Sequence, residues 1–270
     1  MSCHPRVTAW TDTIQTHLPH LSKPQAPVLA LWGLGMVLAR SCALTAVRGF
    51  LAPWLGRQEH TVRQQVREFC YEAAAKRGIG RGALRVETCC VPLLAWGVRV
   101  WQGTQLALAL AATTLGPRLT VLVLSVVSRG GALPIVWVVL PAPATHVWRR
   151  EWVRLLRQVH RAVPRSWTVS VLADRGVYAR WLLRRITRLG WQPFVRLNTG
   201  GTFRPKGSVR GVPLKTVVPE PGTAWQGMGL AGTGRHRQLH GTLLARWEAG
   251  DTDPWLILTE LPPEASTACG

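Results

Sequence analysis

The chain has 270 residues, enough for one large domain or two modest ones, so its folding needs neither disulfides nor a structural metal. Lysine and arginine number 33 against 13 aspartate and glutamate residues, a formal net charge of +20. This excess attracts polyanions by counterion release, so nucleic acid is the leading class of partner. The six cysteines include no C-x-x-C pair, and we expect a reducing cytoplasmic location.

Two apolar stretches are too interrupted to be membrane spans. Residues 26–47 are cut by Arg40, and residues 106–127 are cut by Gly116-Pro117-Arg118. A spanning helix needs about 20 consecutive apolar residues. The N-terminus has no apolar core after a basic region, so no secretory signal is expected. A basic membrane-associated protein is the alternative class, and the interrupted runs count against it.

Residues 1–100 are predicted to form a helical, DNA-binding region. Apolar residues recur at helical spacing through residues 28–47. Thr61-Val62-Arg63-Gln64 is a capping-box pattern, and it predicts a helix over residues 62–75.

This second helix would be basic and amphipathic, with Arg63, Arg67 and Lys76 on it. A basic helix after the turn at Gly56 is typical of a helix-turn-helix that reads DNA. It is equally typical of the charged face of an ordinary helical bundle, because such charge patterns are common. The sequence leaves both interpretations open.

Residues 101–199 are predicted to form an α/β core. Three consecutive strands joined by tight turns, an antiparallel meander, are expected over residues 106–115, 119–128 and 135–140. A helix, a strand, a second helix and another strand should follow over residues 146–163, 167–174, 177–189 and 192–197. This order predicts a mixed sheet flanked by helices, with the fourth strand beside the first.

Residues 200–262 change character again. Gly, Pro and Thr are frequent, and short apolar runs predict an all-β insert after the fifth strand, at residues 209–217, 239–247 and 255–258. Residues 263–270 would be the start of a C-terminal segment.

Only two acidic residues, Glu151 and Asp174, lie between Thr88 and Pro219. Asp174 ends a predicted strand just before a glycine turn and a helix. Open α/β sheets place catalytic and metal-binding groups at such strand ends. The alternative is that Asp174 caps the helix that follows it.

Four segments carry a resemblance to a known family: TVRQQVRE at 61–68, LALALAATTL at 106–115, VLADRGVYAR at 171–180 and DPWLILT at 253–259. Together they resemble the DDE-type transposases of prokaryotic insertion sequences. The resemblance implies a ribonuclease H-like core, Mg²⁺ as cofactor and DNA at the ends of a mobile element as partner. It also implies a nucleoid-associated protein that pairs with another copy or with an intact transposase.

Enzymes of this family hold two divalent metals with three carboxylates. These are an Asp on the first strand, an Asp at the end of the fourth, and a Glu on a helix beyond the β insert. Asp174 matches the second, Ala111 occupies the position of the first, and no helix with the third precedes residue 270.

The resemblance therefore implies an inactive, truncated copy that binds DNA, with contacts from Arg63, Arg67, Lys76, Arg180, Arg184 and Arg185. The alternative is an active transposase that cuts and joins DNA, with Asp174 as metal ligand and another carboxylate completing the site. Glu151, Glu260 and Glu264 are the remaining candidates, and none has the strand-end position needed to meet Asp174.

Overall fold

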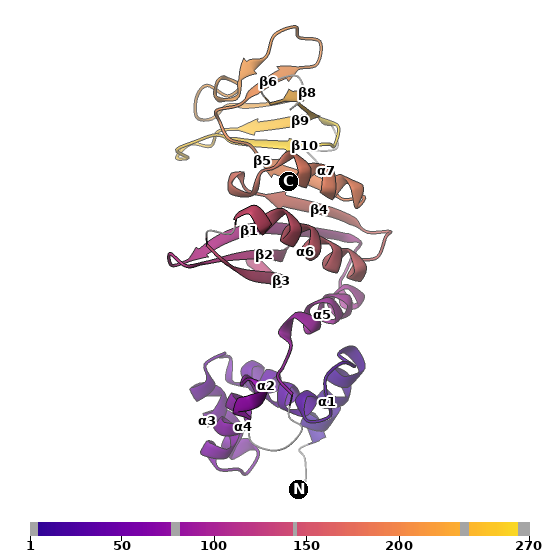
Figure 1. Cartoon of the computed structure of the whole chain (residues 1–270), viewed down its shortest axis with the longest axis vertical. Helices are drawn as coiled ribbons and strands as arrows, with labels where there is room; N and C mark the ends of the chain where they lie inside the picture. Colours follow the sequence, from indigo (N-terminus) through magenta and orange to yellow (C-terminus); the bar gives the residue numbers. More distant parts are fainter. Residues whose placement is uncertain (1–4, 77–81, 143–144, 233–237, 264–270) are drawn as a thin grey trace. The chain divides into compact units, whose positions relative to one another are not determined.

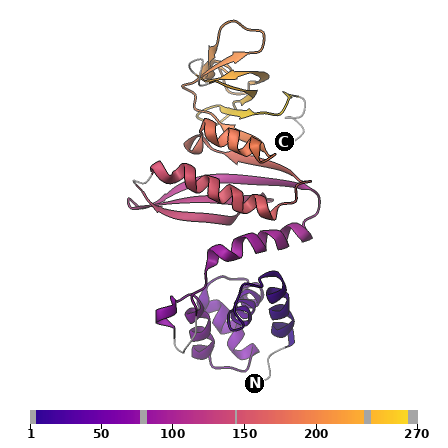
Figure 2. The same ribbon diagram turned by 45° about the vertical axis from the view of Figure 1, so that its right-hand side comes forward.

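The computed structural model describes residues 5–76, 82–142, 145–232 and 238–263. The chain divides into two compact units, Met1–Arg99 and Val100–Gly270, and each is described by itself. Within the described residues there are seven α-helices and ten strands, and every strand belongs to one open, mixed sheet in the second unit (Figures 1 and 2). The prediction of a mixed α/β fold is confirmed.

The first unit is helical. Its elements are α1 Pro5–His17, α2 Gln25–Ala39, α3 Leu44–Trp54, α4 Glu59–Phe69, the 3-10 turn η1 Ala73–Ala75, and α5 Val86–Val100 at its boundary. Val7, Leu31, Val47, Leu51 and Val62 form a buried cluster between α1, α2, α3 and α4. Gly35 lets α2 approach α3, because a Cβ there would lie 2.6 Å from Leu51 Cδ1.

The apolar stretch 26–47 forms two helices with a sharp break between them. Arg40 adopts the left-handed conformation at φ 49°, and its backbone N–H donates to the carbonyls of Met36 and Val37. This geometry satisfies the last carbonyls of α2 and redirects the chain. No single helix in the described residues is long and apolar enough to cross a membrane, and α2 with α3 meets that criterion only as a pair bent by 100°.

The predicted helix over residues 62–75 has wrong boundaries. The helix α4 begins at Glu59, with Gln58 at its N-cap and no side-chain capping bond, so the capping box at Thr61 is not formed. It ends at Phe69, its last buried residue. None of the next four residues is buried. Helices in proteins depend on packing of a buried face more than on propensity.

The second unit has the strand order β3-β2-β1-β4-β5-β10-β9-β8-β6-β7. The strands are β1 Gln105–Leu115, β2 Leu119–Ser128, β3 Gly131–Pro141, β4 Thr168–Ala173, β5 Gln192–Arg196, β6 Thr202–Pro205, β7 Val212–Pro213, β8 Ala224–Ala231, β9 Leu239–Arg246 and β10 Trp255–Thr259. Strands β1, β4 and β5 are parallel, and β2, β3 and β10 pair antiparallel with their neighbours. The predicted meander and the pairing of the fourth strand with the first are confirmed.

Beyond β5, the strands β6 to β10 extend the same sheet, because β10 pairs with β5. The run 209–217 is mostly not a strand: it contains the two-residue β7 and the 3-10 turn η4 Leu214–Thr216. Strand β8 has no matching prediction, because Gly227 and Gly229 weaken its strand pattern. A Cβ at Gly229 would collide with the Arg204 carbonyl oxygen, so β6 and β8 approach closely there.

The helices α6 Trp148–Ala162 and α7 Arg180–Arg188 lie on the same face of the sheet (Figures 1 and 2). The 3-10 turns η2 Thr145–Val147 and η3 Arg175–Val177 precede them. The connections β3–α6–β4 and β4–α7–β5 join parallel strands and advance across the sheet in the same direction, so right-handed crossovers place both helices on one side. Helix α7 starts later than predicted, at Arg180, because η3 intervenes.

Successive side chains along each strand point to opposite faces of the sheet, and one face is more deeply buried than the other. The covered face is buried under α6 and α7 and includes Leu108, Leu110, Val171, Ala173 and Val195. The other face presents side chains that are partly or largely accessible, such as Leu172, which is 41% exposed, and Trp137, which is 38% exposed. The apolar core of this unit therefore lies between the sheet and its two helices.

One edge of the sheet is β3, and the other is β7. Strand β3 contains Pro134 and Pro141, and its pairing with β2 shifts register between Leu124 and Ser125. Prolines and bulges occur at sheet edges because a proline offers no backbone N–H for pairing.

We predict that the two faces differ in their contribution to stability. Leu108→Ala, at a fully buried position under the helices, should lower the free energy of unfolding by about 2–5 kcal/mol. Leu172→Ala, on the open face of the neighbouring strand, should cost about 1 kcal/mol or less. Urea titrations of both variants measure the difference. Equal losses would show that the open face is packed as tightly as the covered one.

Candidate functional site

Asp174 directly follows β4, at the end of the sheet where β1, β4 and β5 have their carboxyl ends. The last paired residues of β1 and β4 are Leu110 and Ala173, and Ala173 is also paired with Val195. The next positions along the three strands are Ala111, Asp174 and Arg196. Because side chains of adjacent strands at one level point to the same face, these three belong to the open face of the sheet.

Arg196 is the charged partner of Asp174. Its Nη1 donates to Asp174 Oδ1 at 3.4 Å, and its guanidinium lies 4.0 Å from the centre of the Trp255 ring. The Arg196 side chain is 17% exposed, whereas the Asp174 side chain is 61% exposed. Stacking on Trp255 therefore holds the guanidinium in place, and the carboxylate reaches it from the solvent side.

Two further acids extend this cluster from the loop before β10. Arg175 Nη1 lies 3.4 Å from Asp253 Oδ2, and Trp255 Nε1 donates to Asp251 Oδ2 at 3.0 Å. The acids Asp174, Asp251 and Asp253 each have a cationic or N–H partner. This strand-end cluster, consisting of Asp174, Arg175, Arg196, Asp251, Asp253 and Trp255, is a polar surface with three carboxylates and two guanidinium groups.

The alternative role of Asp174 as a helix cap is not supported by its side chain. Asp174 is at the N-cap position of η3, but its carboxylate makes no capping hydrogen bond. Its backbone carbonyl accepts a bond from the Val177 N–H at 2.9 Å. The carboxylate is instead directed to Arg196.

The residues at this strand end do not fit a two-metal site. Hard divalent cations need several carboxylates converging on one point. In the described residues no group of three or more His, Cys, Asp or Glu side chains is arranged to hold a metal ion. Position 111 offers only a methyl group, and a guanidinium lies against the one carboxylate that follows β4.

The other candidate acids lie elsewhere. The Glu151 carboxylate accepts a bond from Arg154 Nε on its own helix, at 2.7 Å. Glu260 follows β10, which runs antiparallel to β5, and the preceding Thr259 is paired with Phe194. Glu260 therefore lies toward the opposite end of the sheet, three residue levels and two strand spacings from Asp174. Glu264 is outside the described residues.

Three residues of the first unit are predicted to contact DNA, and their side chains differ in exposure and hydrogen bonding. Arg63 and Arg67 are exposed on α4, opposite the buried Val62 and Val66. Lys76 lies beyond the end of α4, contrary to the prediction that this helix carries it. Its Nζ donates to the carbonyls of Phe69 and Gly82, at 3.3 and 2.9 Å, so its ammonium group ties together backbone segments.

The predicted contacts of the second unit lie on α7. Arg184 is exposed, whereas Arg180 and Arg185 are half-buried, and their Nε atoms are buried without a hydrogen-bond partner among the described residues. Burial raises the pKa of the Tyr178 hydroxyl above its ordinary value, and the charge of Arg180 partly opposes this shift.

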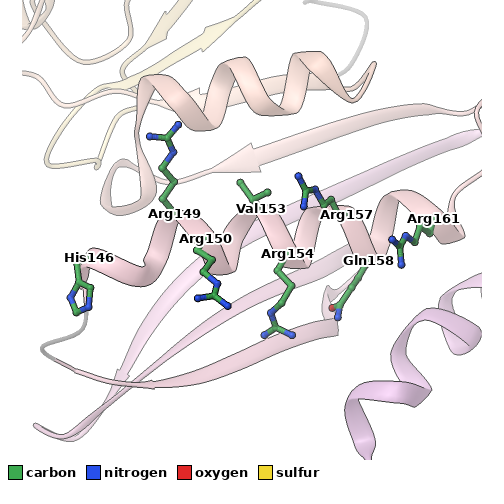
Figure 3. Close-up of a pocket in the computed structure, with 8 residues that line it drawn as sticks. All are labelled: His146, Arg149, Arg150, Val153, Arg154, Arg157, Gln158 and Arg161. Atoms are coloured by element: carbon green, nitrogen blue, oxygen red, sulfur yellow. The ribbon is translucent and has the colours of Figure 1, made fainter.

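Helix α6 carries a feature that the sequence reasoning missed. A surface groove of about 680 Å³ is lined by its side chains: His146, Arg149, Arg150, Val153, Arg154, Arg157, Gln158 and Arg161 (Figure 3). The arginines at 150, 154, 157 and 161 recur at helical spacing. This regular spacing was the available signal.

Comparison with known proteins assigns no family to the chain. No protein-family model matches the sequence, and no curated protein is similar enough to count as a relative.

We predict that Asp174 acts as the partner of Arg196 and holds no metal. Asp174→Asn should then change the free energy of unfolding by about 1 kcal/mol or less, because the carboxylate is largely exposed. Millimolar Mg²⁺ should leave the thermal midpoint of both proteins unchanged, since only an ion that binds the folded state raises it. A rise with Mg²⁺ that disappears in Asp174→Asn would identify a metal ligand.

Proposed function

We propose that the chain is a DNA-binding protein of the DDE transposase type, with a ribonuclease H-like core that does not cleave DNA as it stands. The observation that carries this proposal is the position of Asp174. It follows the fourth strand, which pairs with the first, and it lies at the level of Ala111. This is the arrangement in which the first two acids of the family would meet.

DNA binding is supported by charge and by the α3–α4 segment. The net charge is +20, and polyanion binding follows from such an excess. Helices α3 and α4 are joined by the residues 55–58, with Gly56 at φ 63°. Two helices joined by a short glycine-containing turn are typical of a helix-turn-helix, whose second helix contacts DNA. Here the second helix presents Arg63 and Arg67.

The absence of catalysis follows from the charges at the strand end. A two-metal mechanism needs carboxylates to hold both ions against the scissile phosphate. Asp174 pairs with Arg196 at 3.4 Å, which places a positive charge where the ions would bind, and the Ala111 side chain has no ligand atom. The alternative, an active transposase, would need other carboxylates to converge with Asp174 on the metal ions. Asp251 and Asp253 belong to the same cluster, but in the described residues no group of three or more acidic, His or Cys side chains is arranged to hold an ion.

Binding through α4 can be tested by a salt titration. Each phosphate contact contributes about 0.9 to the slope of log K against log salt, so Arg63→Ala/Arg67→Ala should reduce the slope by up to about 1.8. The measurement is the affinity of the full chain for duplex DNA over a series of salt concentrations.

The matched control is Lys23→Ala/Arg85→Ala, which removes two exposed charges from the same unit outside α3 and α4. Its slope should stay close to that of the unmodified chain. If the slope falls by the same amount in both variants, α4 is not the DNA contact. Binding then depends only on the net charge of the chain.

Catalysis is tested with cleavage assays in Mg²⁺ or Mn²⁺. We expect no strand cleavage by the unmodified chain and none by Ala111→Asp, because Arg196 still pairs with Asp174 and the described residues supply no third ligand there. Ala111→Asp/Arg196→Ala should gain metal binding, detected as a metal-dependent rise of the thermal midpoint, because two carboxylates then face each other without a guanidinium. Cleavage by the unmodified chain that is lost in Asp174→Ala would overturn the non-catalytic assignment.

A further inference from the structure

The outer face of α6 is a stripe of arginines. Trp152, Leu155, Leu156 and Val159 are buried against the sheet, so the opposite side of the helix faces outward. That side carries Arg150, Arg154, Arg157 and Arg161, and Arg149 extends the stripe on the flank of the helix that faces α7; all five are exposed. Figure 3 shows Arg149 reaching toward the neighbouring helix and Arg150 and Arg154 extending the other way.

These charges are poorly balanced by the protein. In the part of the chain that the structure describes, Arg154 is the one member of this stripe with an ion-pair partner, Glu151. Arginines three and four residues apart on a helix repel each other. From Arg149 to Arg161 the stripe is about 18 Å long, at about 1.5 Å per residue.

Helix α7 continues the surface. The Arg149 guanidinium lies 5.7 Å from the centre of the Trp181 ring, so the two helices are neighbours on this face. Arg184 and Arg188 are exposed on α7. We call the five arginines of the stripe together with Arg184 and Arg188 the α6–α7 arginine surface.

The geometry points to a second DNA contact: we propose that the α6–α7 arginine surface binds the phosphates of duplex DNA without reading its sequence. The inference rests on the proposed function and adds a site on the second unit, whereas α4 belongs to the first. Guanidinium groups match phosphate oxygens with two parallel hydrogen bonds, and DNA supplies one charge per about 1.7 Å of helix axis. An 18 Å stripe therefore spans several phosphates.

Other polyanions fit this surface less well. Single-stranded nucleic acid is held largely by bases stacked on exposed aromatic rings. Here Trp152 is buried, Trp148 is half-buried and Trp181 is covered by Arg149. A membrane surface needs an exposed apolar side to insert, but the apolar side of α6 is packed on the sheet.

The surface is also separate from the strand-end cluster. Asp174 and Arg196 belong to the open face of the sheet, and α6 and α7 cover the other face. Substitutions on the outer side of α6 therefore leave the Asp174–Arg196 pair intact.

The test is a salt titration of full-length variants on a duplex of random sequence. Arg150→Gln/Arg157→Gln removes two exposed arginines that neither pair with Glu151 nor stack on Trp181. Its slope should fall by about 1.8, since each phosphate contact contributes about 0.9. The control is Arg118→Gln/Arg129→Gln in the hairpin turns, which makes the same charge change. Its slope should not change.

A charge-conserving variant, Arg150→Lys/Arg157→Lys, should keep the slope and thereby exclude a folding defect as the cause. If Arg150→Gln/Arg157→Gln behaves like the control while the unmodified chain binds duplex, this inference fails and the proposed function stands. If the unmodified chain does not bind duplex at all, both fail. A loss confined to single-stranded DNA or to anionic lipid vesicles would overturn the assignment to duplex.

Discussion

Parallel pairing of β1, β4 and β5 is the constraint on which the second unit depends. These strands come from three separate stretches of the chain, and each pairing requires a crossover that returns the chain to the same end of the sheet. The crossovers α6 and α7 bury the covered face, which sends their arginines outward. The same pairing brings Ala111, Asp174 and Arg196 to one level on the other face. The two candidate surfaces are thus consequences of one topology.

Local patterns predicted the elements of this unit well and those of the first unit less well. Strands β1 and β2 were predicted almost to the residue, because their turns are marked by Gly116-Pro117 and by Gly130-Gly131. The limits of α4 could not be read from Thr61, because helix ends there depend on which side chains are buried by other helices. Strand β8 is held by backbone proximity at Gly229, which leaves no apolar signature in the sequence.

In the candidate sites, too, residues marked by a local sequence pattern could be predicted, and contacts between distant residues could not. Asp174 was found from the sequence, because a carboxylate at the end of an apolar run is a local signal. Arg196 and Trp255 could not be assigned to it, because their contact depends on the pairing of β5 with β10, and 58 residues of sequence lie between the two side chains. The arginines of α6 were readable from their spacing alone. Their significance required the buried face of the helix, which shows that the charged side is turned outward.

The edge strand β3 has a consequence for assembly. A second copy that added a strand there would need a continuous row of backbone donors and acceptors, and Pro134 and Pro141 each lack the donor. The register shift between Leu124 and Ser125 also departs from the regular spacing that such a partner would have to match. Extension of the sheet from one molecule to the next is therefore disfavoured at the β3 edge.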